Sequence, residues 1–447
     1  MQPLKKYLLI CSVTILCVFT HICFSQNTFI NKKFKSDEYN LIHPDQVNAF
    51  YELNQHKLFW YNPGEQFHLL RIELKNILDS ADNIGLKKNK YHLTELNKNI
   101  DTPFTDKDSL AAMQSDRIFT DAAIAYCKDI YQGLNISNWI SYDEISNKYE
   151  DTDNNYLLSR LASLKTSKEL VTYFYSLELA DKEYIMLKTE LQNQLKGEDV
   201  FKKLQLSTSL NLYRWIHHFH FDKYIIVNIG SATLRYYEYD SLLFRMKVVV
   251  GKPSTKTSRF AAYCNQVILY PYWNVPASIA LNELLPKFKR NPNHVDELNM
   301  QLIDAKGKVI DPHKLNWKTY NKNYFPYRIR QSTGCDNSLG VIKFNLTSPY
   351  SIYLHDTNNK TVFKSATRYF SHGCIRLEEP VGLANKLLKN KIDKKFIESC
   401  LKDQIPVPIN LDKPIPVFVV YMTAEIDSKN TLQYYKDVYS LLNKNQQ

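Results

Sequence analysis

The hydrophobic pattern of the sequence changes its period near Ser207, and this change restricts the folds available to the chain. Between Asp45 and about Leu206, apolar residues recur every three or four positions, as expected for helices with one buried face. Gly85 and Gly133 each follow such a segment and are typical helix stops. The first part of the chain is therefore predicted to be helical. The clearest helical stretches are 69–78, 116–130 and 157–195.

After Ser207 the sequence has the texture of antiparallel strands. Short β-branched and aromatic runs alternate with turn pairs such as Gly230-Ser231 and Asp240-Ser241. Helices are predicted only at 378–389 and 394–402. The fold class is therefore α+β, with a mostly helical N-terminal domain and a β-rich second domain. The predicted strands are 223–229, 233–239, 244–250, 267–269, 341–344, 351–354 and 417–424.

One stretch of the β-rich part does not follow a strand pattern. Residues 277–323 are polar and irregular and contain Pro286, Pro292 and Pro312. A long insertion in a compact β domain is often a lid or a binding loop. The predicted organisation is a signal peptide at 1–25, a helical scaffold domain at 26–206, a β-rich domain at 207–427 with the insertion at 277–323, and a tail at 428–447.

The N-terminus has the pattern of a secretory signal peptide. Lys5 and Lys6 precede a nearly unbroken apolar stretch from Tyr7 to Phe24, and Ser25 is a small residue at the expected cleavage site. The alternative is a retained membrane anchor, because the apolar run approaches the length of a spanning helix. Both interpretations predict that the rest of the chain is exported.

The cysteine count suggests a free thiol. Three of the eight cysteines lie in the apolar N-terminal stretch, so five remain in the exported part. An odd number leaves at least one thiol unpaired or bound to another molecule. Their spacings fit neither a disulfide scaffold nor a zinc ribbon. The five are Cys127, Cys264, Cys335, Cys374 and Cys400.

Composition excludes some classes of function. The chain has only 11 glycines, which argues against a Gly-rich nucleotide-binding enzyme. The formal net charge is +11, but no stripe of basic and aromatic residues points to nucleic acid, so no nucleic-acid partner is predicted. The charge either favours anionic envelope polymers or only aids solubility.

Cys374 lies in the run Ser371-His372-Gly373-Cys374, just before a predicted helix, and is the candidate nucleophile. A thiol needs a lowered pKa to ionise near neutral pH, and an imidazole, a cation or a helix start can provide it. His372 and Arg376 lie two residues to either side. The amides of Gly373 and Cys374 are candidate donors to a developing oxyanion.

His355, at the end of a predicted strand, is the candidate general base for this thiol. The backbone or side chain of Asp356 is expected to orient its second ring nitrogen. Each residue also has a structural alternative, since a lone cysteine is more often a buried packing residue and a strand-end histidine is often structural. His355, His372 and Cys374 are also conceivable zinc ligands, but a fourth ligand at a familiar spacing is missing.

Taken together, these residues resemble the catalytic core of the L,D-transpeptidases, in which a histidine is followed after a short gap by Ser/Thr-His-Gly-Cys. Sixteen residues separate His355 from His372 in this chain. The resemblance is to the large periplasmic type and covers most of the exported part. It is carried further by the runs 214–215, 250–253, 273–276 and 421–424.

The resemblance implies a reaction. Cys374 attacks the carbonyl between meso-diaminopimelate and D-alanine in a peptidoglycan tetrapeptide stem, releases D-alanine and forms a thioester. The amine of a neighbouring stem then resolves the thioester to give a 3→3 crosslink. In this scheme His355 is the base, Asp356 orients it, and His372 and Gly373 shape the thiol and oxyanion site.

The resemblance also implies the surroundings of the reaction. Arg376, Tyr353, Trp273 and Ser371 are expected to bind substrate, and 277–323 is expected to cap the cleft. No metal or other cofactor is expected, and carbapenems are expected inhibitors. The implied location is the periplasm, with membrane association only if the signal is uncleaved. Large relatives usually carry a small peptidoglycan-binding domain between scaffold and catalytic domain, but too few residues separate Tyr175 from Arg214 in this chain to house one.

Two other functions remain open at this stage. The same thioester chemistry with water as acceptor would make an L,D-endopeptidase or carboxypeptidase-type cysteine hydrolase of peptidoglycan. A non-catalytic envelope-binding protein that has kept the fold is the alternative from a different class. The hydrolase differs from the transpeptidase only in the acceptor that resolves the thioester. The acceptor site is a surface and not a motif, so the sequence does not separate the two functions well.

Overall fold

The computed structural model describes residues 40–442, apart from 63, 102–108, 147–149, 394, 396, 398, 400–403 and the side chains of 150–153. The predicted signal peptide and Cys400 lie outside the described residues, so the signal stays a prediction. The chain divides into two compact units. The first holds most of the chain up to residue 178, and the second holds 179–447 together with 83–85 and 132–150.

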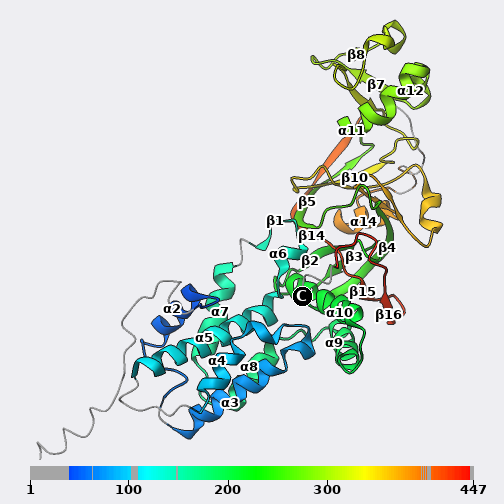
Figure 1. The fold of residues 1–447 in the computed structure, drawn as a ribbon. Helices are drawn as coiled ribbons and strands as arrows, with labels where there is room; N and C mark the ends of the chain where they lie inside the picture. The colour runs from blue at the N-terminus through cyan, green and yellow to red at the C-terminus, as the bar shows by residue number, and fades with distance from the viewer. Residues whose placement is uncertain are drawn as a thin grey trace, which may run out of the picture. The chain divides into compact units, whose positions relative to one another are not determined.

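The first unit is helical, as predicted. A buried carboxylate holds the segment that leads into α3. Asp116 accepts hydrogen bonds from the amides of Trp60 and Tyr61 at 2.7 and 2.8 Å. A buried carboxylate needs such donors, so it fixes the segment in front of α3. The α-helices of this unit, labelled in Figure 1, are α2 (Pro44–Leu53), α3 (Glu65–Asp79), α4 (Leu93–Asn99), α5 (Ser109–Gln132), α7 (Glu150–Ala162) and α8 (Ser167–Leu177).

The second unit is built on a sheet that closes on itself. Strand β14 (Val407–Val420) pairs in parallel with β2 (Lys223–Asn228) and antiparallel with β5 (Phe260–Leu269). The predicted meander of 223–250 is confirmed as β2, β3 and β4. The other strands of the sheet are β1 (Tyr142–Asp143), β3 (Thr233–Glu238), β4 (Ser241–Gly251), β10 (Ile342–Leu346), β11 (Leu354–His355), β12 (Tyr369–Ser371) and β13 (Ile375–Leu377).

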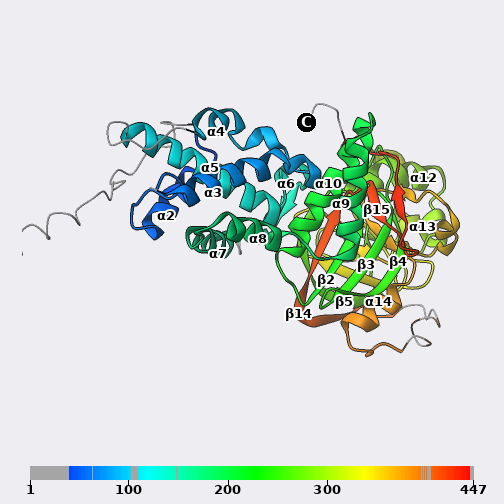
Figure 2. The ribbon, with the colours of Figure 1, turned by 90° about the horizontal axis from the view of Figure 1, so that it is seen from below.

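Two helices that we assigned wholly or partly to the scaffold domain belong to this second unit. Helices α9 (Lys182–Leu195) and α10 (Val200–His217) lie side by side next to β15 (Ala424–Ile426), as Figures 1 and 2 show. Leu206 and Leu210 of α10 pack in one core with Phe418 and Val420 of the sheet. The compact units thus divide at residue 178, earlier than the predicted boundary at 206, because helical periodicity reveals a buried face without revealing what buries it.

The predicted tail at 428–447 is also part of this unit as far as it is described. Strand β16 (Leu432–Tyr434) pairs with β15. Tyr439 is only 1% exposed and stacks on Tyr421, with ring centroids 5.4 Å apart. The pattern of polar residues in this segment gave no sign of a single buried tyrosine.

The insertion is more ordered than its composition suggested. Together with residues that flank it on both sides, over 273–331, it forms a four-stranded sheet and short helices around a core of its own that includes Phe288, Trp317 and Ile329. Its strands are β6 (Trp273–Asn274), β7 (Met300–Ile303), β8 (Val309–Ile310) and β9 (Arg328–Gln331). Its helices are α11 (Ala277–Ile279), a π-helical turn (Ala280–Leu284), α12 (Leu285–Arg290) and α13 (His294–Glu297).

The helix predicted at 378–389 is found as α14 (Pro380–Leu387). Much of the helix predicted at 394–402 lies outside the described residues. Within the described part of the chain, no helix combines the length and the apolar character that crossing a membrane requires.

Candidate active site

Two short parallel strands bring the candidate base to the candidate nucleophile. Leu354 of β11 pairs with Ile375 of β13, and His355 pairs with Arg376. Paired residues of neighbouring strands point to the same face, and so do residues two apart on one strand. His355 and Arg376 therefore share a face with Cys374, which lies just before β13.

These residues line a cleft of about 440 Å³ in the second unit. Its walls come from β11, the turn before β13, and the first residues of the insertion. Eight of the nine predicted site residues line it; Asp356 does not. The eight are Trp273, Tyr353, His355, Ser371, His372, Gly373, Cys374 and Arg376.

The Cys374 thiol is partly buried, and its Sγ lies 3.5 Å from the Ser351 carbonyl oxygen. Burial raises the pKa of this thiol above its ordinary value, while hydrogen bonding from Tyr353 and the charges of Lys343 and Arg376 act in the opposite direction. The sequence pattern had suggested a lowered pKa. In the structure, loss of hydration outweighs the nearby cations, so the free protein holds a neutral thiol.

His355 is 4% exposed, and burial lowers the pKa of its imidazole to about 3. The positive charge of Arg376 lowers the pKa further, and backbone groups of Asp356 and Leu339 act in the opposite direction. The imidazole is therefore neutral near pH 7 and free to accept a proton. A neutral thiol facing a neutral imidazole fits general-base activation better than a preformed ion pair.

Of the two groups of Asp356 expected to orient His355, the backbone interacts with the imidazole and the carboxylate does not. Its Oδ2 accepts a hydrogen bond from the Val341 amide at 3.0 Å, and its Oδ1 pairs with Lys360. Successive residues of a strand face opposite sides, so Asp356 points away from the cleft. Gly340 makes room for it: its φ is +60°, and an added Cβ would lie 2.3 Å from Asp356 Oδ2.

The turn from Ser371 to Cys374 is held from inside. The Gly373 amide donates to Ser371 Oγ at 3.1 Å, and that hydroxyl donates to the Cys374 carbonyl at 2.5 Å. Gly373 has a φ of +122°, which favours glycine. Ser371 therefore positions the turn, whereas we expected it to bind substrate. Of the two amides expected to donate to the oxyanion, that of Gly373 is therefore already engaged. The Cys374 amide has no hydrogen bond to any described residue and is the available donor.

His372 faces the insertion. Its Nε2 lies 2.9 Å from Oε1 of Glu283, in the π-helical turn, and both side chains are well exposed. This contact joins the Ser-His-Gly-Cys run to the segment we expected to cap the cleft. His372 thus lines the mouth of the cleft.

Comparison with known proteins supports what this geometry suggests. Residues 222–409 match the family model of an L,D-transpeptidase catalytic domain (YkuD), and residues 45–191 match that of a scaffold domain. The chain therefore contains an L,D-transpeptidase catalytic domain and a scaffold domain. The α+β class, with a helical region before a β-rich catalytic domain, is confirmed.

A Haemophilus influenzae protein named "Putative L,D-transpeptidase" is 32% identical over 334 residues. The match covers 72% of this chain and 65% of that protein, so the chain spans about two thirds of the relative's length.

Solved L,D-transpeptidases are much more distant. One from Mycobacterium smegmatis is 13% identical with a TM-score of 0.20, over 44% of this chain and 58% of that one. Another, solved in complex with imipenem, is 13% identical with a TM-score of 0.21, over 44% and 59%. Scores this low support no inference about fold or function.

Two lysines of the L,D-transpeptidase domain were missed by the motif. Lys343 pairs with His355 across β10 and β11, and its Nζ lies 4.2 Å from the centre of the Tyr353 ring. Lys256 lines the cleft, and its Nζ donates to the Tyr439 carbonyl at 2.6 Å. The orientation of Lys343 could have been predicted from the sequence. It immediately precedes Phe344 in a predicted strand, so its side chain must face the side opposite to that of Phe344.

Arg376 is the polar group in the transpeptidase cleft best placed to bind an anion. Burial lowers the pKa of its guanidinium, and the structure gives it no hydrogen bond or ion pair with any described residue. A half-buried arginine without an acceptor favours a carboxylate ligand. The described residues contain no group of three or more His, Cys, Asp or Glu side chains able to hold a metal ion.

The end of the domain supports the turn from behind. The Tyr439 hydroxyl donates to the Gly251 carbonyl at 2.5 Å and accepts from the Thr257 amide at 3.2 Å. Thr257 Oγ1 in turn donates to the Gly373 carbonyl at 2.8 Å. We call Tyr439, with Tyr421 stacked on it, the C-terminal brace. No part of the motif indicated it.

Proposed function

We propose that this chain is a peptidoglycan L,D-transpeptidase that forms 3→3 crosslinks through a thioester on Cys374. The observation that carries the proposal is the neutral Cys374 thiol beside the neutral, buried His355 in one cleft. The match of residues 222–409 to an L,D-transpeptidase catalytic domain, and the similarity to a protein named "Putative L,D-transpeptidase", support this class of enzyme. The predicted signal peptide supports a periplasmic location for the reaction.

In the first half of the reaction, Cys374 Sγ attacks the carbonyl between meso-diaminopimelate and D-alanine. His355 takes the thiol proton as the carbon–sulfur bond forms, so a free thiolate never accumulates. The Cys374 amide donates to the oxyanion. The carbon–nitrogen bond then breaks, and His355 returns the proton to the leaving D-alanine amine.

In the second half, an amine of a neighbouring stem attacks the thioester. His355 accepts its proton, the carbon–sulfur bond breaks and the sulfur is reprotonated. Arg376 is suited to hold a carboxylate of the donor stem during both halves, because it has a fixed charge and no competing acceptor. If water replaced the amine, the enzyme would be a hydrolase. If neither attack occurred, it would be an envelope-binding protein.

Acylation by a carbapenem tests the first half. Purified mature protein incubated with imipenem should gain the mass of one drug molecule, as read by intact-mass spectrometry, because a strained lactam carbonyl replaces the stem carbonyl. The Cys374→Ala variant should gain nothing. An unchanged adduct on that variant, or no adduct on the native chain, contradicts the proposal.

Muropeptide analysis tests the second half. Native protein incubated with tetrapeptide stems should release D-alanine and yield dimers joined through two diaminopimelate residues. Tripeptides without new dimers would assign the hydrolase function instead.

A further inference from the structure

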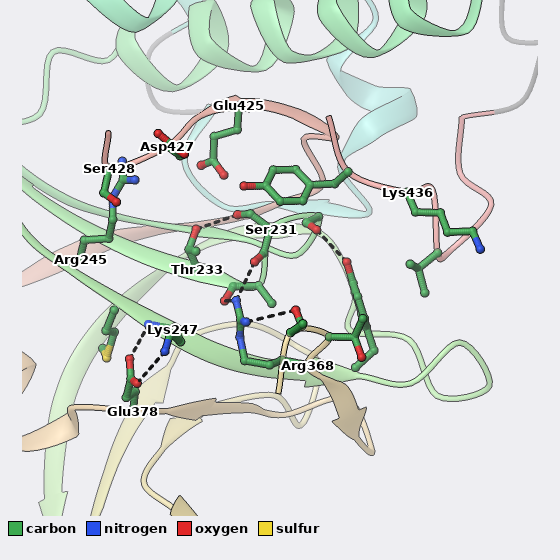
Figure 3. A pocket seen from close by; sticks show the side chains of 18 residues that line it. Ser231, Thr233, Arg245, Lys247, Arg368, Glu378, Glu425, Asp427, Ser428 and Lys436 are labelled. Carbon is green, nitrogen blue, oxygen red and sulfur yellow. Dashed lines mark hydrogen bonds and ion pairs between the residues drawn. The ribbon is translucent and has the colours of Figure 1, made fainter. Parts of the chain in front are cut away.

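A second hollow in the catalytic unit is larger than the cleft that holds Cys374. It measures about 700 Å³ and lies between the β3–β4 hairpin and the β15–β16 hairpin (Figure 3). No residue lines both the hollow and the cleft. We call it the side hollow.

Some polar groups around the side hollow are committed to the fold. The Arg368 guanidinium donates to the carbonyls of Val248, Ser231 and Ala232, at 3.2, 3.0 and 3.1 Å. Lys247 pairs with Glu378 at 3.5 Å. These groups build the wall and are not available to a ligand.

Other groups face the side hollow without a full set of partners. The structure gives the Tyr435 hydroxyl and the Lys436 ammonium no acceptor among the described residues. Burial raises the pKa of Tyr435 to about 12, so its hydroxyl remains a donor at neutral pH. Arg245 Nε is buried and has no hydrogen-bond partner in the described part of the chain. Such groups normally find a partner, and a ligand is one source.

The charges of the side hollow alternate across it. In Figure 3, Arg245 and Lys436 lie at opposite ends, and Glu425 lies between them. Glu425 is 2% exposed, and one of its oxygens lies 2.7 Å from Arg235 Nη2. Asp427 also lines the side hollow beside Arg245, and Arg245 Nη2 lies 3.7 Å from Glu183 Oε1. A purely anionic ligand would therefore meet Glu425 and Asp427, and a purely cationic one would meet Arg245 and Lys436. A ligand with carboxylates at its ends and an ammonium or amide group between them matches Arg245, Lys436 and Glu425.

We propose that the side hollow binds a short zwitterionic peptide, of the class that peptidoglycan stems provide. Lys436 and Arg245 hold carboxylates, the Tyr435 hydroxyl donates to a ligand oxygen, and Glu425 accepts from an ammonium or amide group. The identity of the peptide as a stem rests on the proposed function. The enzyme would then hold the polymer at a second point while Cys374 acts on another stem.

Calorimetric titration of a synthetic tetrapeptide stem tests this site. Cys374→Ser protein is titrated so that no covalent step occurs. Lys436→Met and Tyr435→Phe should each weaken binding at the second site about fivefold, the loss of one partly exposed ion pair or hydrogen bond. Lys429→Met, on the exposed loop between β15 and β16, is the matched control and should bind as the parent does. The same peptide with its carboxylates amidated should lose this site.

The result is separable from the proposed function. Binding that is the same in Lys436→Met, Tyr435→Phe and Lys429→Met, or a single site lost on changing Arg376→Met, overturns the side-hollow proposal. In the Cys374 background, both side-hollow variants should still form the imipenem adduct at the native rate. If no adduct forms but the peptide binds the side hollow, the proposed reaction fails and the second site stands.

Discussion

At the residue scale, the reacting pair is defined by burial more than by charge. Loss of hydration raises the pKa of Cys374 and lowers that of His355, so both groups are neutral in the free protein. Lys343 and Arg376 partly offset the effect on the thiol. In the proposed reaction, the proton therefore moves during attack and not before it.

Alkylation of Cys374 by iodoacetamide reports this balance. The rate should keep rising above the pKa of about 8.5 of an ordinary thiol, because burial keeps the sulfur protonated. Lys343→Met should slow alkylation about fivefold at pH 8, since removing a nearby cation costs the thiolate on the order of 1 kcal/mol. The measurement is the pseudo-first-order rate across pH.

Lys389→Met is the matched control, because this exposed lysine pairs with Asp412 away from the cleft. A plateau below pH 8, or equal rates in the two lysine variants, would contradict the assignment of Lys343.

The motif predicted the two residues that we propose react, and the structure places both in one cleft, but the motif did not indicate the residues around them. His355 and Cys374 were identifiable because their chemistry requires fixed residue types at a fixed separation. Of the two groups of Asp356 expected to orient His355, only the backbone is placed to do so, because strand alternation puts the carboxylate on the opposite face. The role of Ser371 could not be deduced, because its hydroxyl bonds depend on the positive φ of Gly373.

At the element scale, the turn before β13 depends on two segments far from it in sequence. Thr257, after β4, bonds the Gly373 carbonyl, and Tyr439 holds both Thr257 and Gly251. The chain between Gly251 and Thr257 is thus clamped between the turn and the C-terminal brace. A substitution in the C-terminal brace should therefore change the rate of acylation by shifting the position of Gly373.

Tyr439→Phe should reduce the rate constant of acylation by imipenem about tenfold without changing the affinity of the initial complex. The lost hydroxyl bonds a carbonyl and an amide that position the turn but touch no substrate. Stopped-flow measurement over a range of drug concentrations separates the two quantities. The fold should also lose about 1–2 kcal/mol of unfolding free energy.

Tyr434→Phe is the matched control, because this nearby hydroxyl bonds Glu190 at 3.2 Å and not the turn. If both variants lose the same acylation rate, the brace has only a general structural role.

The strand meander was predictable because alternating apolar residues and turn pairs mark it locally. The C-terminal brace was not, because a single buried tyrosine between polar residues has no period. The insertion was misjudged for a related reason. Its core is built from scattered aromatic residues such as Phe288 and Trp317, which no regular spacing connects.

At the scale of the whole molecule, three histidines link stability to pH: His218 and His355 are buried and His43 is partly buried. Burial lowers the pKa of His43 and His218 to about 4 and that of His355 to about 3. In the unfolded chain these groups titrate near pH 6.5. Between those values the unfolded chain binds more protons, so the free energy of unfolding falls as the pH drops below 6.5.

Each histidine should contribute up to about 1.4 kcal/mol per pH unit in this window. Urea unfolding at pH 7, 6 and 5 measures the slope for the native chain and for His355→Gln. The variant should lose less stability between pH 6 and 5 than the native chain loses. His313→Gln, at an exposed position, controls for replacing a histidine; equal slopes in native and His355→Gln protein would contradict the prediction.

The change of hydrophobic period near Ser207 predicted that the chain has two parts. It did not predict where the two compact units divide. Helices α9 and α10 have the same amphipathic pattern as the scaffold helices, and only the packing of Leu206 and Leu210 with Phe418 assigns α10 to the second unit. Sequence pattern gives the buried face of a helix, while its partner depends on the tertiary structure.

The C-terminal brace makes activity depend on where the chain stops. Every side chain with a proposed role in bond making or breaking lies at or before Arg376, yet the turn is held through Tyr439. A chain trimmed by a carboxypeptidase to residue 436 would keep the complete motif and lose the hydroxyl that holds Gly251 and Thr257. Such a protein would still contain the Ser-His-Gly-Cys motif but should react slowly. Removal of the last residues should therefore lower activity without changing any residue proposed to react.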